Sequence, residues 1–210
     1  FIEINLSFLL SYLFVYVFQM ASFEDIEYDS NYSLASRQFF LLYDTTIPSQ
    51  CAGPSSVIVL NNASILKFIC PYNNLLCCRN YIHDHNQKMF TIALSDDKMN
   101  EWNDDNNQIT ETNIRKVFIF CETFSQYLAM KRWRGCYRRK IRGIYLSDTF
   151  EQKLLQLGVD YIREILPEFR RERGTYRRLC TDAQNLLQAL NNYFQDQIDS
   201  LSDDGTEETS

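Results

Sequence analysis

"RKVFIFCETF", residues 115–124, contains an apolar run from Val117 to Cys121 and then turns polar. A short run that is apolar at every position, rather than at alternate ones, indicates a strand buried on both faces. Three further segments of this kind occur at 38–44, 88–95 and 140–146, and helical patterns separate them. Strands that alternate with helices predict a parallel sheet covered on both sides.

These segments predict a three-layer α/β fold of the flavodoxin-like kind, with a mostly parallel sheet of four or five strands. The fifth strand is ambiguous. "VIVLNN" (57–62) and "SILKFICP" (64–71) supply one strand and one short helix or edge strand between them, and periodicity does not separate the two.

Helical periodicity covers 72–83, 122–133 and 148–169, and Ser147 or Asp148 is expected to cap the last of these. The polar segment 96–113 is expected to hold one helical turn and a long loop. Thr181 and Gln184 have capping-box spacing, which predicts that an extra C-terminal helix opens there. Its inward-facing residues are expected to be Leu186, Leu187, Leu190, Tyr193, Phe194 and Ile198.

The composition suits a single globular domain. The chain has 210 residues, of which 45% are hydrophobic and 14% aromatic, so it is long enough to bury a sizeable core. We assign residues 38–201 to one α/β domain. A flexible acidic lead is expected over 20–37, and a disordered acidic tail over 202–210.

Residues 1–19 form a hydrophobic segment, "FIEINLSFLLSYLFVYVFQ". The segment lacks an initiator Met and a basic start, and it contains Glu3 and Asn5, which a signal peptide would not favour. We interpret it as a gene-model extension upstream of a start at Met20. The alternative is a signal anchor, and only then would a membrane be a partner.

The seven cysteines are an odd number, and none forms a C-x-x-C pair. The adjacent residues Cys77 and Cys78 suit neither a zinc site nor a disulfide framework, so reduced intracellular thiols are expected. The chain contains neither G-x-G-x-x-G nor G-x-x-x-x-G-K-[ST]. We therefore predict no metal and no cofactor.

A family resemblance rests on "RKVFIFCETFSQYLAMKRWRGCYRRKIRGIYLSD" (115–148), on the long helix that follows, and on a helix rich in Leu, Asn and Gln. This pattern resembles an uncharacterised α/β domain of invertebrate multidomain proteins, often found ahead of tetratricopeptide-like or ADP-ribosyltransferase modules. The resemblance covers about residues 38–200. It implies an α/β fold but carries over no catalytic residue.

Cys121 is the first candidate for chemistry because it ends a predicted strand, where the following helix could lower its pKa. The two histidines, His83 and His85, precede a strand rather than follow one, and "CETF" has no glycine turn to supply oxyanion donors. A buried core thiol is the competing interpretation, and we favour it.

A crevice at the carboxyl ends of the strands is the second candidate. Asp44, Asp96, Cys121 and Thr123 follow three of the predicted strands, and open α/β sheets bind ligands at that edge. Receiver domains also place acidic and hydroxyl residues there. The acidic pair that would hold Mg²⁺ near Asp44 and the expected Lys after the last strand are missing, so a working phosphoacceptor is not predicted.

The third candidate is a basic patch. Residues 131–178 carry fourteen lysines and arginines against six acids, and "KRWRGCYRRKIR" (131–142) interleaves its cations with Trp133 and Tyr137. Cations attract phosphates and aromatic rings can stack on bases. The residues expected to bind a polyanion are Arg132, Arg134, Arg138, Arg139, Lys140 and Arg142. The competing interpretation is a solvated helix end with Trp133 packed inward.

We therefore predict a non-catalytic, cytoplasmic interaction or regulatory domain whose partner is another protein. The alternative is binding of RNA or another polyanion through residues 131–142. A cysteine-dependent enzyme at Cys121 is the second alternative.

Overall fold

Five parallel strands form one sheet in the order β2-β1-β3-β4-β5. The computed structural model describes residues 30–42, 63–72, 74–104, 112–133 and 139–203. The strands are β1 (Arg37–Leu42), β2 (Ile69–Tyr72), β3 (Met89–Ser95), β4 (Ile114–Cys121) and β5 (Ile141–Leu146). This order is the flavodoxin-like one, so the predicted fold class is confirmed.

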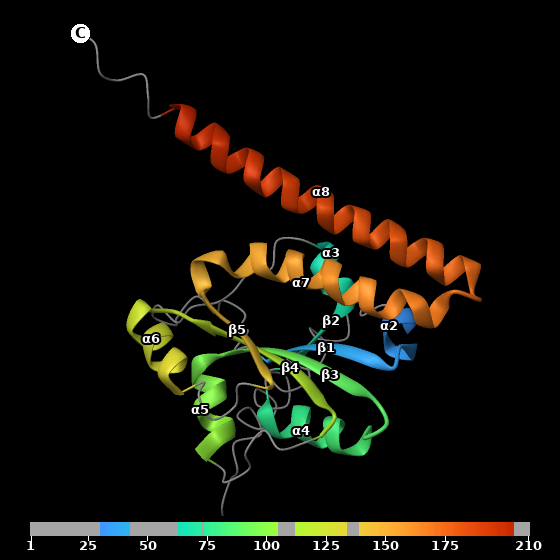
Figure 1. Ribbon diagram of the computed structural model, residues 1–210, viewed down its shortest axis with the longest axis horizontal. Helices are drawn as coiled ribbons and strands as arrows, with labels where there is room; N and C mark the ends of the chain where they lie inside the picture. The colour runs from blue at the N-terminus through green and yellow to red at the C-terminus, as the bar shows by residue number, and fades with distance from the viewer. Residues whose placement is uncertain (1–29, 43–62, 73, 105–111, 134–138, 204–210) are drawn as a thin grey trace, which may run out of the picture.

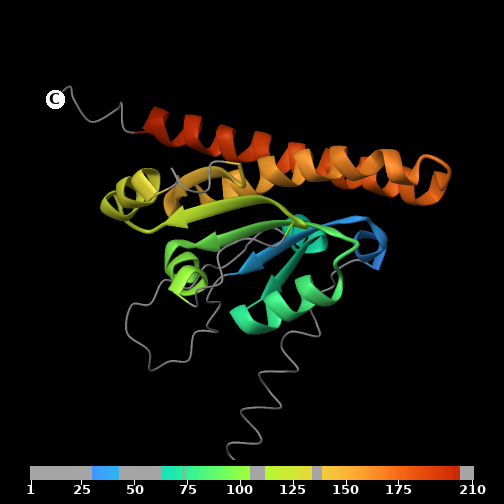
Figure 2. The same cartoon turned by 60° about the horizontal axis from the view of Figure 1, so that its bottom comes forward.

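Helices cover both faces of the sheet (Figure 1). One face packs against α4 (Leu75–Asp84), α5 (Asp96–Asp104) and α6 (Phe124–Trp133). The other face packs against α3 (Ala63–Phe68) and α7 (Phe150–Ile165), together with residues around the short helix α2 (Ser30–Leu34). The extra C-terminal helix α8 (Arg173–Asp203) lies over α7 as an outer layer (Figure 2).

The two-sided burial follows from the apolar runs of the strands. In β4, Phe118 and Phe120 join the core cluster under α7, while Val117, Ile119 and Cys121 join the cluster under α5 and α6. Successive side chains of a strand point to opposite faces, so a strand buried on both sides must be apolar throughout.

Three helices converge at Gly158 of α7. A Cβ atom at this position would lie 2.5 Å from the Phe68 ring of α3 and 2.9 Å from Leu186 of α8. The missing side chain therefore lets α8 approach α7 closely. Nearby, the buried carboxylate of Asp182 accepts hydrogen bonds from Tyr32 Oη at 2.9 Å and Lys67 Nζ at 3.1 Å, which joins α8 to α2 and α3.

The segment 96–113 differs from the prediction. A nine-residue helix, α5, replaces the single helical turn, and it buries Met99 and Trp102 almost completely. The Ser95 hydroxyl accepts a hydrogen bond from Lys98 N at 3.3 Å, so Ser95 caps the helix and two acids follow it in the first turn. These features stabilise a helix start, and the polar composition of the segment concealed them.

The last two helices also start elsewhere than predicted. A 3₁₀ turn at Ser147–Thr149 leads into α7, and neither Ser147 nor Asp148 is its N-cap residue. The helix α8 begins at Arg173, so Thr181 lies inside it and its hydroxyl donates to the carbonyl of Arg177 at 3.1 Å. The capping box predicted at 181–184 is therefore wrong.

The end of the expected flexible lead is structured. Residues 30–34 form α2, and both Tyr32 and Ala35 are fully buried in the core under α7. The predicted domain therefore extends toward the N-terminus by about one helical turn. Residues 1–19 lie outside the described residues, as do 57–62 and most of the acidic tail.

Candidate functional site

The predicted crevice at the carboxyl edge of the sheet is partly assembled. Asp96 follows β3 and Cys121 ends β4, and the neighbouring strands bring the two side chains close enough for the carboxylate to disfavour the thiolate. Asp44 lies outside the described residues. Thr123 caps the helix α6 and makes its hydrogen bonds within that cap.

Cys121 is a buried thiol. Its side chain is fully buried, and burial raises its pKa to about 12, with the Asp96 carboxylate as the second cause. A thiol acts as a nucleophile through its thiolate, and activation requires a lowered pKa. The environment of Cys121 acts in the opposite direction.

The two histidines lie at the other edge of the sheet. They occupy the C-terminal end of α4 and the residue after it, and Ile82 in that turn accepts a hydrogen bond from Asn113 Nδ2 at 3.0 Å. Asn113 directly precedes β4, so this region adjoins the amino ends of the strands. His85 stacks on the Tyr81 ring, with 3.9 Å between ring centroids. No Cys121–His pair therefore forms.

Thr123 caps a helix. Its hydroxyl accepts a hydrogen bond from Gln126 N at 3.3 Å, and its own N–H donates to Gln126 Oε1 at 2.8 Å. This reciprocal pair is a capping box at the start of α6. Asp96 is almost completely buried at the start of α5, its Oδ1 has no hydrogen-bond partner, and burial raises its pKa. The carboxyl edge is thus built mainly from core and capping groups.

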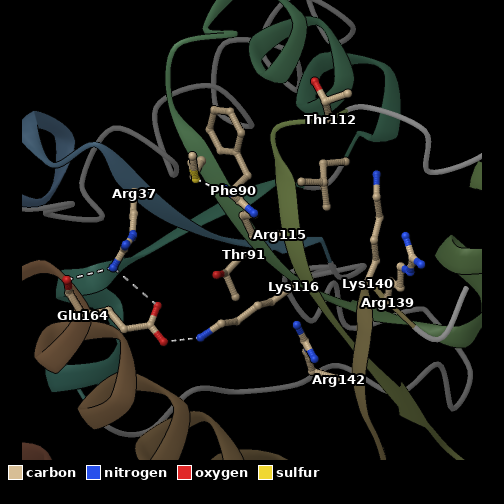
Figure 3. Close-up of a pocket in the computed structure, with 12 residues that line it drawn as sticks. Arg37, Phe90, Thr91, Thr112, Arg115, Lys116, Arg139, Lys140, Arg142 and Glu164 are labelled. Carbon is tan, nitrogen blue, oxygen red and sulfur yellow. Dashed lines mark hydrogen bonds and ion pairs between the residues drawn. The ribbon is translucent and has the colours of Figure 1, made fainter.

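A basic depression of about 670 Å³ opens at the amino edge of the sheet (Figure 3). Its lining comes from the first residues of β1, β3 and β4, from the approach to β5 and its start, and from the last turn of α7. Among its described lining residues, six are cationic and one is a carboxylate. The cations are Arg37, Arg115, Lys116, Arg139, Lys140 and Arg142, and the carboxylate is Glu164.

Glu164 links two of these cations across the sheet edge. Its carboxylate forms an ion pair with Lys116 of β4 and lies 3.9 Å from Arg37 Nη1 of β1 (Figure 3). Arg37 also donates to the Glu164 carbonyl oxygen at 2.9 Å. These contacts hold the end of α7 against β1 and β4 and balance about one of the positive charges.

The remaining cations are more accessible. Arg115, Arg139 and Arg142 are exposed, and no carboxylate among the described residues forms an ion pair with them. Arg115 Nε lies 3.0 Å from the Met89 sulfur, which is a weak acceptor. The hydroxyls of Thr91 and Thr112 lie on the same lining. The depression therefore combines a net positive charge with neutral hydrogen-bonding groups.

Only some residues of the predicted basic patch belong to this site. Arg139, Lys140 and Arg142 line the depression, as the sequence indicated. Arg132 is exposed near the end of α6 and is not a lining residue. Arg134 and Arg138 lie outside the described residues, and Trp133 is half-buried against the core.

Sequence reasoning missed Arg37, Arg115 and Lys116. The signal that could have found them is that two of the most apolar strands carry cations within their first three residues, "RQFF" and "IRKV". In a parallel sheet, the first residues of neighbouring strands meet at one edge. Basic strand starts therefore predict a basic edge.

No family model matches the chain, and neither the curated proteins nor the solved structures yield a match. Within the described ranges, no three His, Cys, Asp or Glu residues gather to hold a metal ion. In the same part of the chain, no helix has both the length and the apolar character needed to cross a membrane.

Proposed function

We propose that this chain is a non-catalytic binding domain whose ligand is a polyanion, held in the basic depression at the amino edge of the sheet. The observation that carries this proposal is the convergence of six cationic side chains from separate segments, with one carboxylate among the described lining residues. The buried thiol and the distant histidines at the other edge favour binding over cysteine chemistry.

The lining supports recognition of anionic groups rather than of bases. Among the described lining residues the one aromatic is Phe90, which is fully buried and offers no face for stacking. Arginine side chains bind phosphate through paired N–H donors, and the two threonine hydroxyls add neutral donors. We therefore expect binding that depends on the density of negative charge and not on nucleotide sequence.

The first test measures binding of a fluorescein-labelled oligouridine of about 12 nucleotides, a length suited to one site, by fluorescence anisotropy. Inorganic tripolyphosphate serves as the competitor. At 50 mM NaCl we expect a dissociation constant on the order of micromolar. About three phosphate contacts give a slope of about −2 for the logarithm of the association constant against the logarithm of the salt concentration. Oligoadenosine of the same length is expected to bind equally well.

The double variant Arg139→Glu/Arg142→Glu is expected to weaken binding by about 30-fold or more, because it reverses two accessible charges in the depression. Arg171→Glu/Arg177→Glu is the matched control, since it makes the same change in charge near the start of α8. We expect the control to lose less than about threefold. Equal losses in both variants, or no binding by the unmodified chain, would overturn the proposal.

A further inference from the structure

The helix α8 carries two apolar stripes, and only one of them packs against the rest of the domain. The inner stripe packs on α7 and α3 and contains Leu179, Ala183, Leu186, Ala189 and Leu190. These residues belong to the first two-thirds of the helix. From Phe194 to Leu201, every residue is exposed.

The second stripe faces solvent. Leu187, Phe194, Ile198 and Leu201 are 51%, 45%, 57% and 76% exposed. The prediction that Leu187, Phe194 and Ile198 face inward is therefore wrong. In Figures 1 and 2, α8 diverges from α7 toward its C-terminal end.

The spacing of the exposed stripe is that of a coiled coil. With Asn191 included, the residues Leu187, Asn191, Phe194, Ile198 and Leu201 follow one another at intervals of four, three, four and three. This is a heptad pattern with Leu or Phe at each d position and Asn191 and Ile198 at the a positions. A branched residue at a with Leu at d favours two strands in parallel.

The charges lie outside this seam. Asp196 and Asp199 occupy the outer f and b positions of the heptad, whereas Gln188, Gln195 and Gln197 flank the seam at e and g. Charged e and g residues normally set the choice of a different partner or repel an identical one. Uncharged flanks let the same surface of two identical chains meet without repulsion.

We propose that the C-terminal part of α8, from Leu187 to Leu201, forms a parallel two-stranded coiled coil with a second copy of this chain. In this arrangement the two Asn191 side chains meet and can hydrogen-bond to each other. An antiparallel pair would place each amide against an apolar side chain, at a cost in free energy. A single Asn at an a position is a known device for fixing the register of such pairs.

The domain leaves room for this dimer. At about 100° per residue, the seam lies roughly a quarter turn around α8 from the stripe that packs on α7. A twofold axis through the seam therefore places the two globular bodies on opposite sides of the helix pair. The helix is already formed by its packing on α7, so association does not have to nucleate it.

The test is the molar mass of the full chain, measured by light scattering after size-exclusion chromatography over a range of concentrations. Two heptads bury a small seam, so we expect a reversible equilibrium between monomer and dimer with a dissociation constant of about 10–100 µM. Phe194→Asp/Ile198→Asp should remain monomeric throughout, because it places charges in the seam.

The matched control is Asn192→Asp, which adds an acid to the same exposed turn at a b position. It should dimerise like the unmodified chain. All substituted residues are exposed, so circular dichroism is expected to show an unchanged fold. A monomer at every concentration, or a dimer that survives Phe194→Asp/Ile198→Asp, would overturn the proposal.

Asn191→Leu tests the register. Replacing a polar a residue by an apolar one is expected to strengthen association by about tenfold or more. An unchanged dissociation constant would show that Asn191 lies outside the interface and that the seam is wrong. The outcome does not depend on the polyanion site, since residues 187–201 do not line the basic depression.

Discussion

The two ends of β4 differ in burial and in charge. At its carboxyl end, Cys121 is buried beside the buried carboxyl group of Asp96, and burial raises the pKa of both groups. At its amino end, Arg115 and Lys116 reach the rim of an open basic depression. One strand therefore joins a core-forming edge to a solvated, charged edge. Among the described residues, the open basic depression therefore lies at the edge opposite the one where α/β folds usually bind ligands.

The contrast is sharpest in thiol reactivity. A pKa of about 12 instead of the ordinary 9.0 leaves Cys121 with about 1000-fold less thiolate at neutral pH than an ordinary thiol. Cys77 is exposed on α4 and provides the internal reference. We expect iodoacetamide to alkylate Cys77 at least about 1000-fold faster than Cys121 in the folded protein, as followed by peptide mass spectrometry. Comparable rates would show that the carboxyl edge opens to solvent.

Replacing Cys121 tests whether that edge serves the fold alone. Cys121→Ser places a hydroxyl in an apolar site, so we expect a loss of about 1–3 kcal/mol in the free energy of unfolding, measured by urea denaturation. Oligouridine binding should change less than about twofold, because the depression lies at the other end of the strand. Cys77→Ser is the exposed control and should leave stability within about 0.5 kcal/mol. If Cys121→Ser folded but lost oligouridine binding, both edges of the sheet would belong to one binding site.

The sequence predicted the elements of the core better than their ends. The four main strands were recognisable because burial on both faces leaves an unbroken apolar run. Helix starts were harder, since the pattern T-x-x-Q occurs three times, at Thr123, Thr149 and Thr181. Thr149 precedes α7 but makes no side-chain cap hydrogen bond. Thr123 follows a strand and forms the capping box, whereas residues before Thr181 already continue a helix. The local motif is the same, and the preceding backbone decides between a cap and a helix interior.

The site was predictable only in part, for a geometric reason. Arg139, Lys140 and Arg142 form a cluster in the sequence, so their charge density was visible directly. Arg37 and the pair Arg115 and Lys116 lie far from that cluster in the sequence, and only the strand order places them beside it. The exposed stripe of α8 was misassigned for a related reason, since an apolar residue on a helix does not reveal how far the neighbouring helix extends.

Glu164 offers a smaller test of the basic edge. Glu164→Gln removes the carboxylate that neutralises Lys116 and Arg37, so we expect oligouridine to bind about 3- to 10-fold more tightly at low salt. The measurement is the anisotropy titration at 50 mM NaCl. Glu168→Gln, in the 3₁₀ turn that follows α7, is the control, because its carboxylate accepts from Ser36 and does not line the depression. Weaker binding by Glu164→Gln would mean that Glu164 chiefly positions the cations.

Asp96 provides the smallest test, which concerns the pH dependence of stability. Burial raises its pKa in the folded state above the ordinary 3.8, so the folded protein holds this proton more tightly than the unfolded chain does. The stabilisation is complete below pH 3.8 and is lost as pH rises through the raised pKa. Asp96→Asn places a side chain there that stays neutral at every pH. We therefore expect this variant to be more stable than the unmodified protein by about 1 kcal/mol at pH 7.

The difference between the two proteins should shrink as the pH falls toward 4, because protonated Asp96 is then also neutral. Urea denaturation at pH values from 4 to 8 measures it. Asp148→Asn, an exposed change in the turn after β5, is the control and should shift stability equally little at every pH. If Asp96→Asn were less stable at pH 7, the helix N-terminus would stabilise the buried carboxylate by more than its burial costs.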